Sequence, residues 1–297
     1  MSSICVIGAG KWGQALHYAL NQNQKCLITS RTKKNIENFV SLEEALNCEY
    51  LIIAIPSQSI REWLTSNFKY SGQKVLVAAK GIEANTCSFL QDIYEQFVPN
   101  KNLGFISGPS FASEVIKGLP TALVLNSTNK DFYDQFYKFF PSFIKTYYSS
   151  DVIGAEIAGA YKNVLAIASG ICDGLNLGQN ARASLISRGL VEMERFGNHY
   201  GAKKDTFLGL SGAGDLFLTA SSTLSRNFRV GLGLAENKSL NTILEELGEV
   251  AEGVKTSEAI YKLSSKHSIY TPIANEVKQI LEGKNPQLSL KDLLKSH

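Results

Sequence analysis

Short apolar runs recur along the first half of the chain, and each is followed by a turn. Apolar runs without polar alternation are typical of parallel strands that are buried on both faces. They predict strands over residues 4–7, 25–29, 51–55, 75–79, 103–106, 121–125 and 144–148, with a helix over 14–20 after the first. The first half is therefore expected to form an α/β domain with a Rossmann-type, doubly wound sheet.

The strand pattern fades at Asp151, where Ala- and Leu-rich segments with helical spacing take over. Helices are predicted over residues 155–168, 182–196, 240–247 and 257–263. A chain of this length is long enough for two domains. We expect a dinucleotide-binding domain over 1–150 and an all-α substrate domain over 151–297.

Composition narrows the class of protein. Hydrophobic residues make up 44% and charged residues 19% of the 297 positions, which is ordinary for a soluble enzyme. A net charge of +3 gives no reason to expect a nucleic acid or an acidic membrane as partner. No apolar run reaches the length of about 18 residues that a membrane span needs.

Cysteine and histidine spacing predicts neither disulfides nor a metal site. The five cysteines form no CxxC pair, and three of them lie in apolar runs, as small buried residues of a reducing compartment do. The four histidines show no ligand spacing, so no catalytic metal is expected. With no basic leader before the first strand, these features favour a cytoplasmic location.

A G-x-G-x-x-G motif follows the first predicted strand and opens the first predicted helix. In this context Gly8 permits a tight turn, Gly10 lets a pyrophosphate approach the backbone, and Gly13 lets the helix pack on the strand. The free N–H groups and the dipole at the helix start favour an anion. The motif predicts a dinucleotide site.

The second predicted strand ends in a basic segment. An NAD site usually has an acidic residue here to hold the ribose 2′-hydroxyl, and none is present. Arg31, with Lys33 or Lys34, could instead hold a 2′-phosphate, which favours NADPH over NADH. The other interpretation of this segment is a solvated basic turn.

Two further strand ends carry residues suited to ligands. Lys80 follows the fourth predicted strand, and the segment from Ser107 to Ala112 follows the fifth with two hydroxyls and a glycine. Ligands of open α/β sheets bind beyond the carboxyl ends of the strands. These residues are therefore candidates for contact with cofactor or substrate.

The second half contains a dense polar segment, residues 208–233, with a Gly-Ala-Gly-Asp turn and the sequence Ser225-Arg226-Asn227. The guanidinium fork of Arg226 matches phosphate oxygens bidentately, and Asn227 adds donors beside it. Taken alone, the segment is equally consistent with a polar loop between two helices.

Lys162 lies within a small-residue, apolar helix. Its side chain either reaches outward to solvent or is buried for a chemical purpose. Periodicity alone favours the outward position. If Lys162 is buried, Asp215 is a candidate to orient its ammonium, and the lysine becomes a candidate acid/base group for a hydride-transfer reaction.

The motifs together resemble those of bacterial NAD(P)-dependent glycerol-3-phosphate dehydrogenase. The shared segments, in order, are GAGKWGQAL, KGIE, SGPSFASEV, AGAYKNVLAIASGICDGLNLGQNARASLISRGLVEM, LSGAGDLFLT and LSRNFRVG. The resemblance extends from Ile4 to about Pro272. It implies reversible reduction of dihydroxyacetone phosphate to sn-glycerol 3-phosphate for glycerophospholipid synthesis, and a C-terminal domain related to that of 6-phosphogluconate dehydrogenase. Members of the family are often homodimers.

The resemblance also implies roles for individual residues. Lys162 matches the proton donor/acceptor, and Lys80 matches a lysine that meets both cofactor and substrate. As a mechanistic hypothesis, Lys80 stabilises the charge on the developing alkoxide. The implied substrate contacts are Lys80, Gly108, Ser110, Lys162, Asp215, Ser225, Arg226 and Asn227. Beside the glycine turn, the implied cofactor contacts are Trp12, Arg31, Lys80, Ala112, Arg226, Val250 and Glu252. Lys11 replaces the serine of many members and adds a candidate pyrophosphate contact.

Two rival functions remain at this point. One is a dehydrogenase of the same architecture that acts on a hydroxy acid or ketopantoate, although a carboxylate substrate would have less use for Ser225-Arg226-Asn227. The other is a non-catalytic protein that senses NADPH, although sensing alone needs neither Lys80 nor Lys162.

Overall fold

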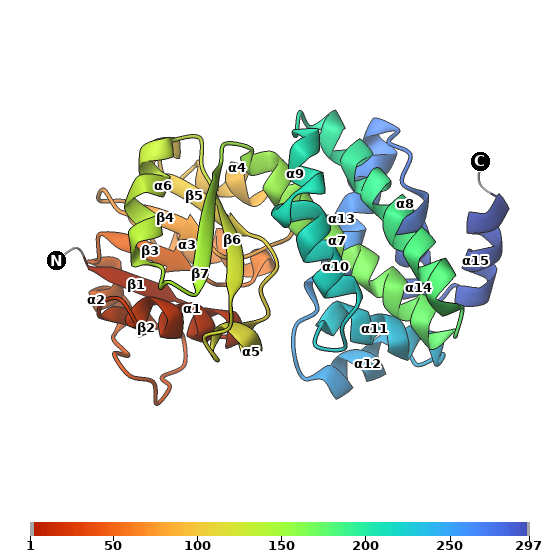
Figure 1. Cartoon of the computed structure of the whole chain (residues 1–297), viewed down its shortest axis with the longest axis horizontal. Helices are drawn as coiled ribbons and strands as arrows, with labels where there is room; N and C mark the ends of the chain where they lie inside the picture. The colour runs from red at the N-terminus through yellow and green to blue at the C-terminus, as the bar shows by residue number, and fades with distance from the viewer. Residues whose placement is uncertain (1–2, 296–297) are drawn as a thin grey trace. The chain divides into compact units, whose positions relative to one another are not determined.

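The computed structural model describes residues 3–295 (Figure 1). Contacts divide the chain into two compact units. The first comprises the chain up to Lys80 together with Leu90–Val152, and the second comprises Gly81–Phe89 and the chain from Ile153 onward. The first unit is built on a sheet and the second is helical, so the expected fold class is confirmed.

The first unit contains a seven-stranded sheet with the order β2-β1-β3-β4-β5-β6-β7. Neighbouring strands are parallel except for the antiparallel pair β5 and β6. Chain order reverses between β1 and β3, which makes this the switch point where ligands of such sheets bind. The strands are β1 (Ile4–Ile7), β2 (Cys26–Thr29), β3 (Tyr50–Ile53), β4 (Lys74–Val77), β5 (Leu103–Ser107), β6 (Thr121–Asn126) and β7 (Ile144–Ser149).

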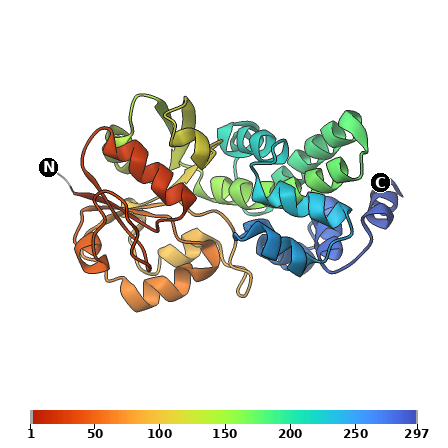
Figure 2. The ribbon, with the colours of Figure 1, turned by 90° about the horizontal axis from the view of Figure 1, so that it is seen from below.

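Helices cover both faces of this sheet because alternate strand residues point to opposite sides. Ile4 and Val6 of β1 pack in one apolar cluster with Leu16 of α1, whereas Cys5 and Ile7 pack in another with α3. Figure 2 shows α1 on one side of the sheet and the orange helix α3 on the other. The helices are α1 (Lys11–Asn21), α2 (Leu42–Leu46), α3 (Ile60–Asn67), α4 (Leu90–Tyr94), α5 (Ala112–Val115) and α6 (Lys130–Phe136), with short 3₁₀ turns η1 (Ser57–Ser59), η2 (Asn100–Asn102) and η3 (Tyr137–Phe139).

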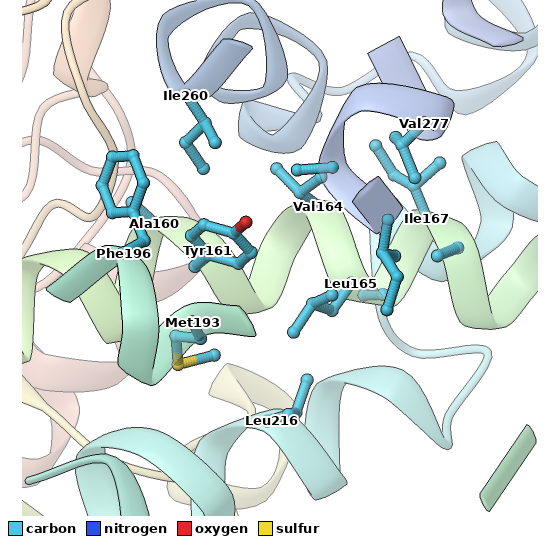
Figure 3. Packing of buried hydrophobic residues seen from close by; sticks show 14 of the residues in the cluster. Ala160, Tyr161, Val164, Leu165, Ile167, Met193, Phe196, Leu216, Ile260 and Val277 are labelled. Carbon is cyan, nitrogen blue, oxygen red and sulfur yellow. The ribbon is translucent and has the colours of Figure 1, made fainter. Parts of the chain in front are cut away.

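The second unit is organised around helix α7 (Val152–Gly174), which is buried along residues 154–172. Its small and apolar side chains allow neighbours on every side. Figure 3 shows its residues Tyr161 and Leu165 among Met193 and Phe196 of α8 and side chains of later helices. The other elements are α8 (Gly178–His199), α9 (Lys204–Leu208), the π-helical turn η4 (Leu210–Gly214), α10 (Asp215–Ala220), α11 (Arg226–Ala235), α12 (Leu240–Leu247), α13 (Glu252–His267), α14 (Pro272–Leu281) and α15 (Pro286–Lys295).

The structure decides two points about the second half that the sequence left open. The segment 208–233, open to interpretation as a polar loop, is mostly helical and includes α10 and α11. The chain beyond Pro272, on which the sequence patterns were silent, forms α14 and α15. Gly231 lies where α11 packs closely on α7, because a Cβ there would lie 2.1 Å from the Ile167 carbonyl oxygen. A close α7–α11 contact of this kind leaves little local pattern.

Candidate active site

The glycine turn lies at the switch point of the sheet. Gly8 adopts φ +109°, and a Cβ there would lie 2.5 Å from the carbonyl oxygen of Ala54, just after β3. A Cβ on Gly13 would lie 1.8 Å from the carbonyl oxygen of Gly8. A Cβ on Gly10, by contrast, would have nothing within 4 Å. Two glycines are thus required by the packing of the turn, and the third leaves open space above the backbone.

The start of α1 is suited to an anion. Gly10 is its N-cap residue and provides no side-chain cap, and the first turn contains no acidic residue. The backbone N–H groups of a first turn lack partners within the helix, and the helix dipole makes this end positive. These residues therefore fit a pyrophosphate. Lys11 is exposed beside them, and Trp12 is partly buried against the core.

The basic segment after β2 contacts the glycine turn through one residue. The ammonium of Lys34 donates a hydrogen bond of 2.7 Å to the carbonyl oxygen of Ala9, which also accepts one of 2.9 Å from Gln14 Nε2. Arg31 and Lys33 are exposed. The segment is therefore not wholly a solvated turn, because Lys34 connects it to the nucleotide-binding motif.

Three residues expected at the site converge on one carbonyl group in the first unit. Lys80 Nζ lies 3.4 Å from the carbonyl oxygen of Gly108, and Ser110 Oγ donates to the same oxygen at 3.2 Å. Gly108 needs φ +109° for this turn. Ala112 begins α5, which packs against α1. Residues that follow β4 and β5 are thus brought together, as expected for strand carboxyl ends.

In the second unit, Lys162 is buried and paired. Its Nζ donates to Asp215 Oδ1 at 2.5 Å and to Thr219 Oγ1 at 3.1 Å, and the Thr219 hydroxyl donates to Asp215 Oδ1 at 3.2 Å. The side chains of Lys162 and Asp215 are only 9% and 2% exposed. The outward position that periodicity favoured for Lys162 is wrong, because α7 has helices around its whole circumference.

The start of α11 gathers the other polar residues of this unit. Ser225 is the N-cap, and its Oγ accepts the N–H of Phe228. Asn227 is buried, and its Oδ1 accepts the N–H of Gly253 at 3.0 Å, next to Glu252 at the start of α13. A Cβ on Gly253 would lie 2.7 Å from that oxygen.

Arg226 and Val250 remain accessible at this end of α11 and α13. The Arg226 side chain is 46% exposed, and its nearest carboxylate is Glu249, at 3.8 Å. Val250 is 56% exposed.

Sequence reasoning missed Thr219 and underrated Lys34. Thr219 lies four residues after Asp215, so both side chains occupy one face of α10. That spacing is a usable signal once Asp215 is suspected. Lys34 had no such signal, because its contact with Ala9 crosses 25 positions.

The residues that the structure describes contain no cluster of three or more His, Cys, Asp or Glu side chains arranged to hold a metal ion. Within the same residues, no helix is long and apolar enough to cross a membrane. The five cysteines are free thiols.

A mostly parallel sheet with its glycine turn at the switch point, together with a buried lysine held by a carboxylate, is typical of an NAD(P)-dependent dehydrogenase of the Rossmann type. Comparison with known proteins gives the particular family. Residues 19–133 match the model of the NAD-dependent glycerol-3-phosphate dehydrogenase N-terminus, and residues 151–291 match that of its C-terminus. The chain belongs to the NAD-dependent glycerol-3-phosphate dehydrogenase family.

Individual relatives agree with this assignment. The chain is 63% identical to glycerol-3-phosphate dehydrogenase (NAD(P)+) of Sulfurimonas denitrificans and 60% identical to that of Campylobacter jejuni, over 99% of this chain and of each relative. It is similar to the crystal structure of the Coxiella burnetii enzyme with a TM-score of 0.90 and 32% identity, over 99% of both chains. The resemblance, the enzyme class and the use of an NAD(P) cofactor are therefore confirmed.

Proposed function

We propose that the chain catalyses the reversible reduction of dihydroxyacetone phosphate to sn-glycerol 3-phosphate, with NADPH preferred over NADH. The observation that carries the proposal is the buried Lys162–Asp215–Thr219 group, in a chain that shares its full length with glycerol-3-phosphate dehydrogenases. Such a group has a chemical use in hydride transfer and none in nucleotide sensing.

The first unit is proposed as the cofactor domain and the second as the substrate domain. The glycine turn would hold the pyrophosphate of NAD(P)H, and the bound cofactor would supply the hydride. The open space above Gly10 and the uncapped start of α1 support pyrophosphate binding there. Arg31 supports a preference for a 2′-phosphate, because the usual acidic residue is missing after β2. Further cofactor contacts are proposed for Lys11, Trp12, Lys80, Ala112, Arg226, Val250 and Glu252.

In the second unit, Lys162 is proposed to give its proton to the alkoxide that develops on the substrate. Asp215 keeps the ammonium charged between turnovers, and Thr219 limits its rotation through a second hydrogen bond. Lys80 is proposed to stabilise the negative charge on the same oxygen. Substrate contacts are proposed for Gly108, Ser110, Asp215, Ser225, Arg226 and Asn227, with the phosphate at Arg226 and Asn227.

Three finer statements also belong to this proposal. The product is expected to feed glycerophospholipid synthesis in the cytoplasm. The family resemblance supports a homodimer as the assembly to test first, by sedimentation. The hydroxy-acid and ketopantoate alternatives are tested by offering those substrates in place of dihydroxyacetone phosphate.

The experiment follows NADPH or NADH oxidation in the presence of dihydroxyacetone phosphate, with wild-type protein and Lys162→Met. Loss of a positioned acid should lower kcat roughly a hundredfold to ten-thousandfold. Lys266→Met, an exposed change on α13, is the matched control and should leave kcat unchanged. Near-normal turnover of Lys162→Met would refute the role of Lys162 as the proton donor. If the wild-type protein oxidises NADPH with ketopantoate but not with dihydroxyacetone phosphate, the rival dehydrogenase is favoured.

A further inference from the structure

Arg229 is a cation near the proposed phosphate site that has no role in the proposed reaction. Arg229 lies on α11, partly buried, and its Nε is fully buried without a hydrogen-bond partner. Within residues 3–295, the guanidinium makes no hydrogen bond or ion pair at all. A donor that is withdrawn from water, as this Nε–H is, normally keeps a partner, because an unpaired buried donor costs about 1–3 kcal/mol. A missing ligand is one physical reason for such a group.

The electrostatics of the helix start point the same way. Arg226 and Arg229 are three residues apart, which makes them neighbours on the helix surface, and like charges at this spacing repel. Both lie at the positive end of the α11 dipole, and the first turn contains no acidic residue to offset them. The Glu249 carboxylate, 3.8 Å from Arg226 Nη1, is the ion-pair partner found for either arginine in the described chain. Arg229 thus adds a second positive charge at this end without a carboxylate paired to it in the described chain, which favours the binding of an anion.

Side-chain direction brings Arg229 toward the same place. A long side chain on a helix extends over the turn that precedes its own Cα, which for Arg229 is the turn that begins at Ser225. Asn227 lies in that turn, and because its Oδ1 accepts the Gly253 N–H, its NH₂ group is left to donate. Three donor groups on one turn suit the oxygens of a phosphate.

We propose that Arg229 is a second phosphate-binding arginine, which acts beside Arg226 at the start of α11 and takes the phosphate ester of the substrate. This inference rests on the proposed function, since that function supplies a substrate with a phosphate. A pyrophosphate of the cofactor has the same chemistry, so the experiment separates the two sources.

The test compares wild-type protein with Arg229→Met and Arg229→Lys. Affinity for sn-glycerol 3-phosphate and for NADPH is measured by titration calorimetry, and the thermal midpoint is measured with and without inorganic phosphate. Loss of a charge-assisted hydrogen bond should weaken sn-glycerol 3-phosphate binding roughly ten- to a hundredfold in Arg229→Met. NADPH affinity should be unchanged. Arg229→Lys should recover part of the loss, because it keeps the charge without the fork.

A structural arginine would behave differently. Removing an unpaired cation from the positive end of a helix should leave the ligand-free thermal midpoint equal or higher, while the stabilisation by inorganic phosphate shrinks. Arg188→Met, an exposed change on α8, is the matched control and should alter neither quantity. A lowered ligand-free midpoint with unchanged phosphate affinity would overturn the inference in favour of a structural role.

Two other results separate the inference from the reaction. A loss of NADPH affinity alone would move Arg229 to the cofactor and overturn its assignment to the substrate. If wild-type protein binds phosphate through Arg229 but does not oxidise NADPH with dihydroxyacetone phosphate, the proposed reaction falls and the anion site stands.

Discussion

Replacing Asp215 with asparagine should destabilise the second unit strongly, because it leaves Lys162 buried without its counter-charge. The ion pair spans 2.5 Å between side chains that are 9% and 2% exposed, so water cannot take the place of the carboxylate without rearrangement. Removing one partner of a buried pair costs about 3–5 kcal/mol.

The cost of deprotonating Lys162 sets an independent upper limit on the free energy of unfolding that Asp215→Asn loses, and this limit is similar in size. The ammonium can escape its position by losing its proton, and holding an ordinary lysine of pKa about 10.4 neutral at pH 7 costs about 4.6 kcal/mol. The cost to the variant therefore lies between about 3 and 4.6 kcal/mol. Because the unfolded chain then binds one more proton than the folded chain, the deficit should shrink by about 1.4 kcal/mol for each pH unit above 7, until the unfolded lysine also loses its proton.

The assay is urea unfolding at pH 7 and at about pH 9, followed by far-ultraviolet circular dichroism, which reports the helices. Both tryptophans, Trp12 and Trp63, belong to the first unit, so their fluorescence follows that unit separately. Glu258→Gln is the matched control, because its 2.8 Å pair with Lys262 is 36% and 46% exposed. Such a pair is worth about 1 kcal/mol at most. A deficit for Asp215→Asn below about 1 kcal/mol, or one that does not change with pH, would refute the reasoning.

Two further predictions concern the helical unit. Gly231→Ala places a Cβ 2.1 Å from the backbone oxygen of Ile167, so it should lower the free energy of unfolding by about 1–3 kcal/mol or more. Gly189→Ala meets only the end of the Leu165 side chain, at 2.6 Å, and should lower it by less. Equal unfolding midpoints of the two variants would contradict this prediction. Burial raises the pKa of Glu192, although its carboxylate accepts the N–H groups of Ile273 and Ala274 and the Tyr161 hydroxyl, which partly offset the rise. The stability that this raised pKa contributes is fully present below the ordinary glutamate pKa of about 4.3 and is lost as pH rises through the folded value. The unfolding free energy of wild type minus that of Glu192→Gln should therefore fall as pH rises from about 4 toward 7, and a value that rises over this range would count against the reasoning.

The sequence by itself determined the features that depend on local periodicity and on single residue types. Apolar runs located all seven strands to within a few residues, and the glycine motif located the turn after β1, because only glycine fits the φ of +109° and the backbone contact at Gly8. The change from strand to helix near Asp151 was visible for the same reason. These patterns express a period of two or of 3.6 residues, which a chain carries in its order alone.

Tertiary structure decided which side chains meet. Lys162 and Asp215 are 53 positions apart, and only the packing of α10 against the buried helix α7 makes them an ion pair with Thr219. The lack of any partner for Arg229 within the described chain is likewise a property of the fold, and so is the contact of Lys34 with Ala9. Burial and pairing depend on what surrounds a residue in space, and no local pattern of charged residues distinguishes a solvated lysine from one enclosed by helices.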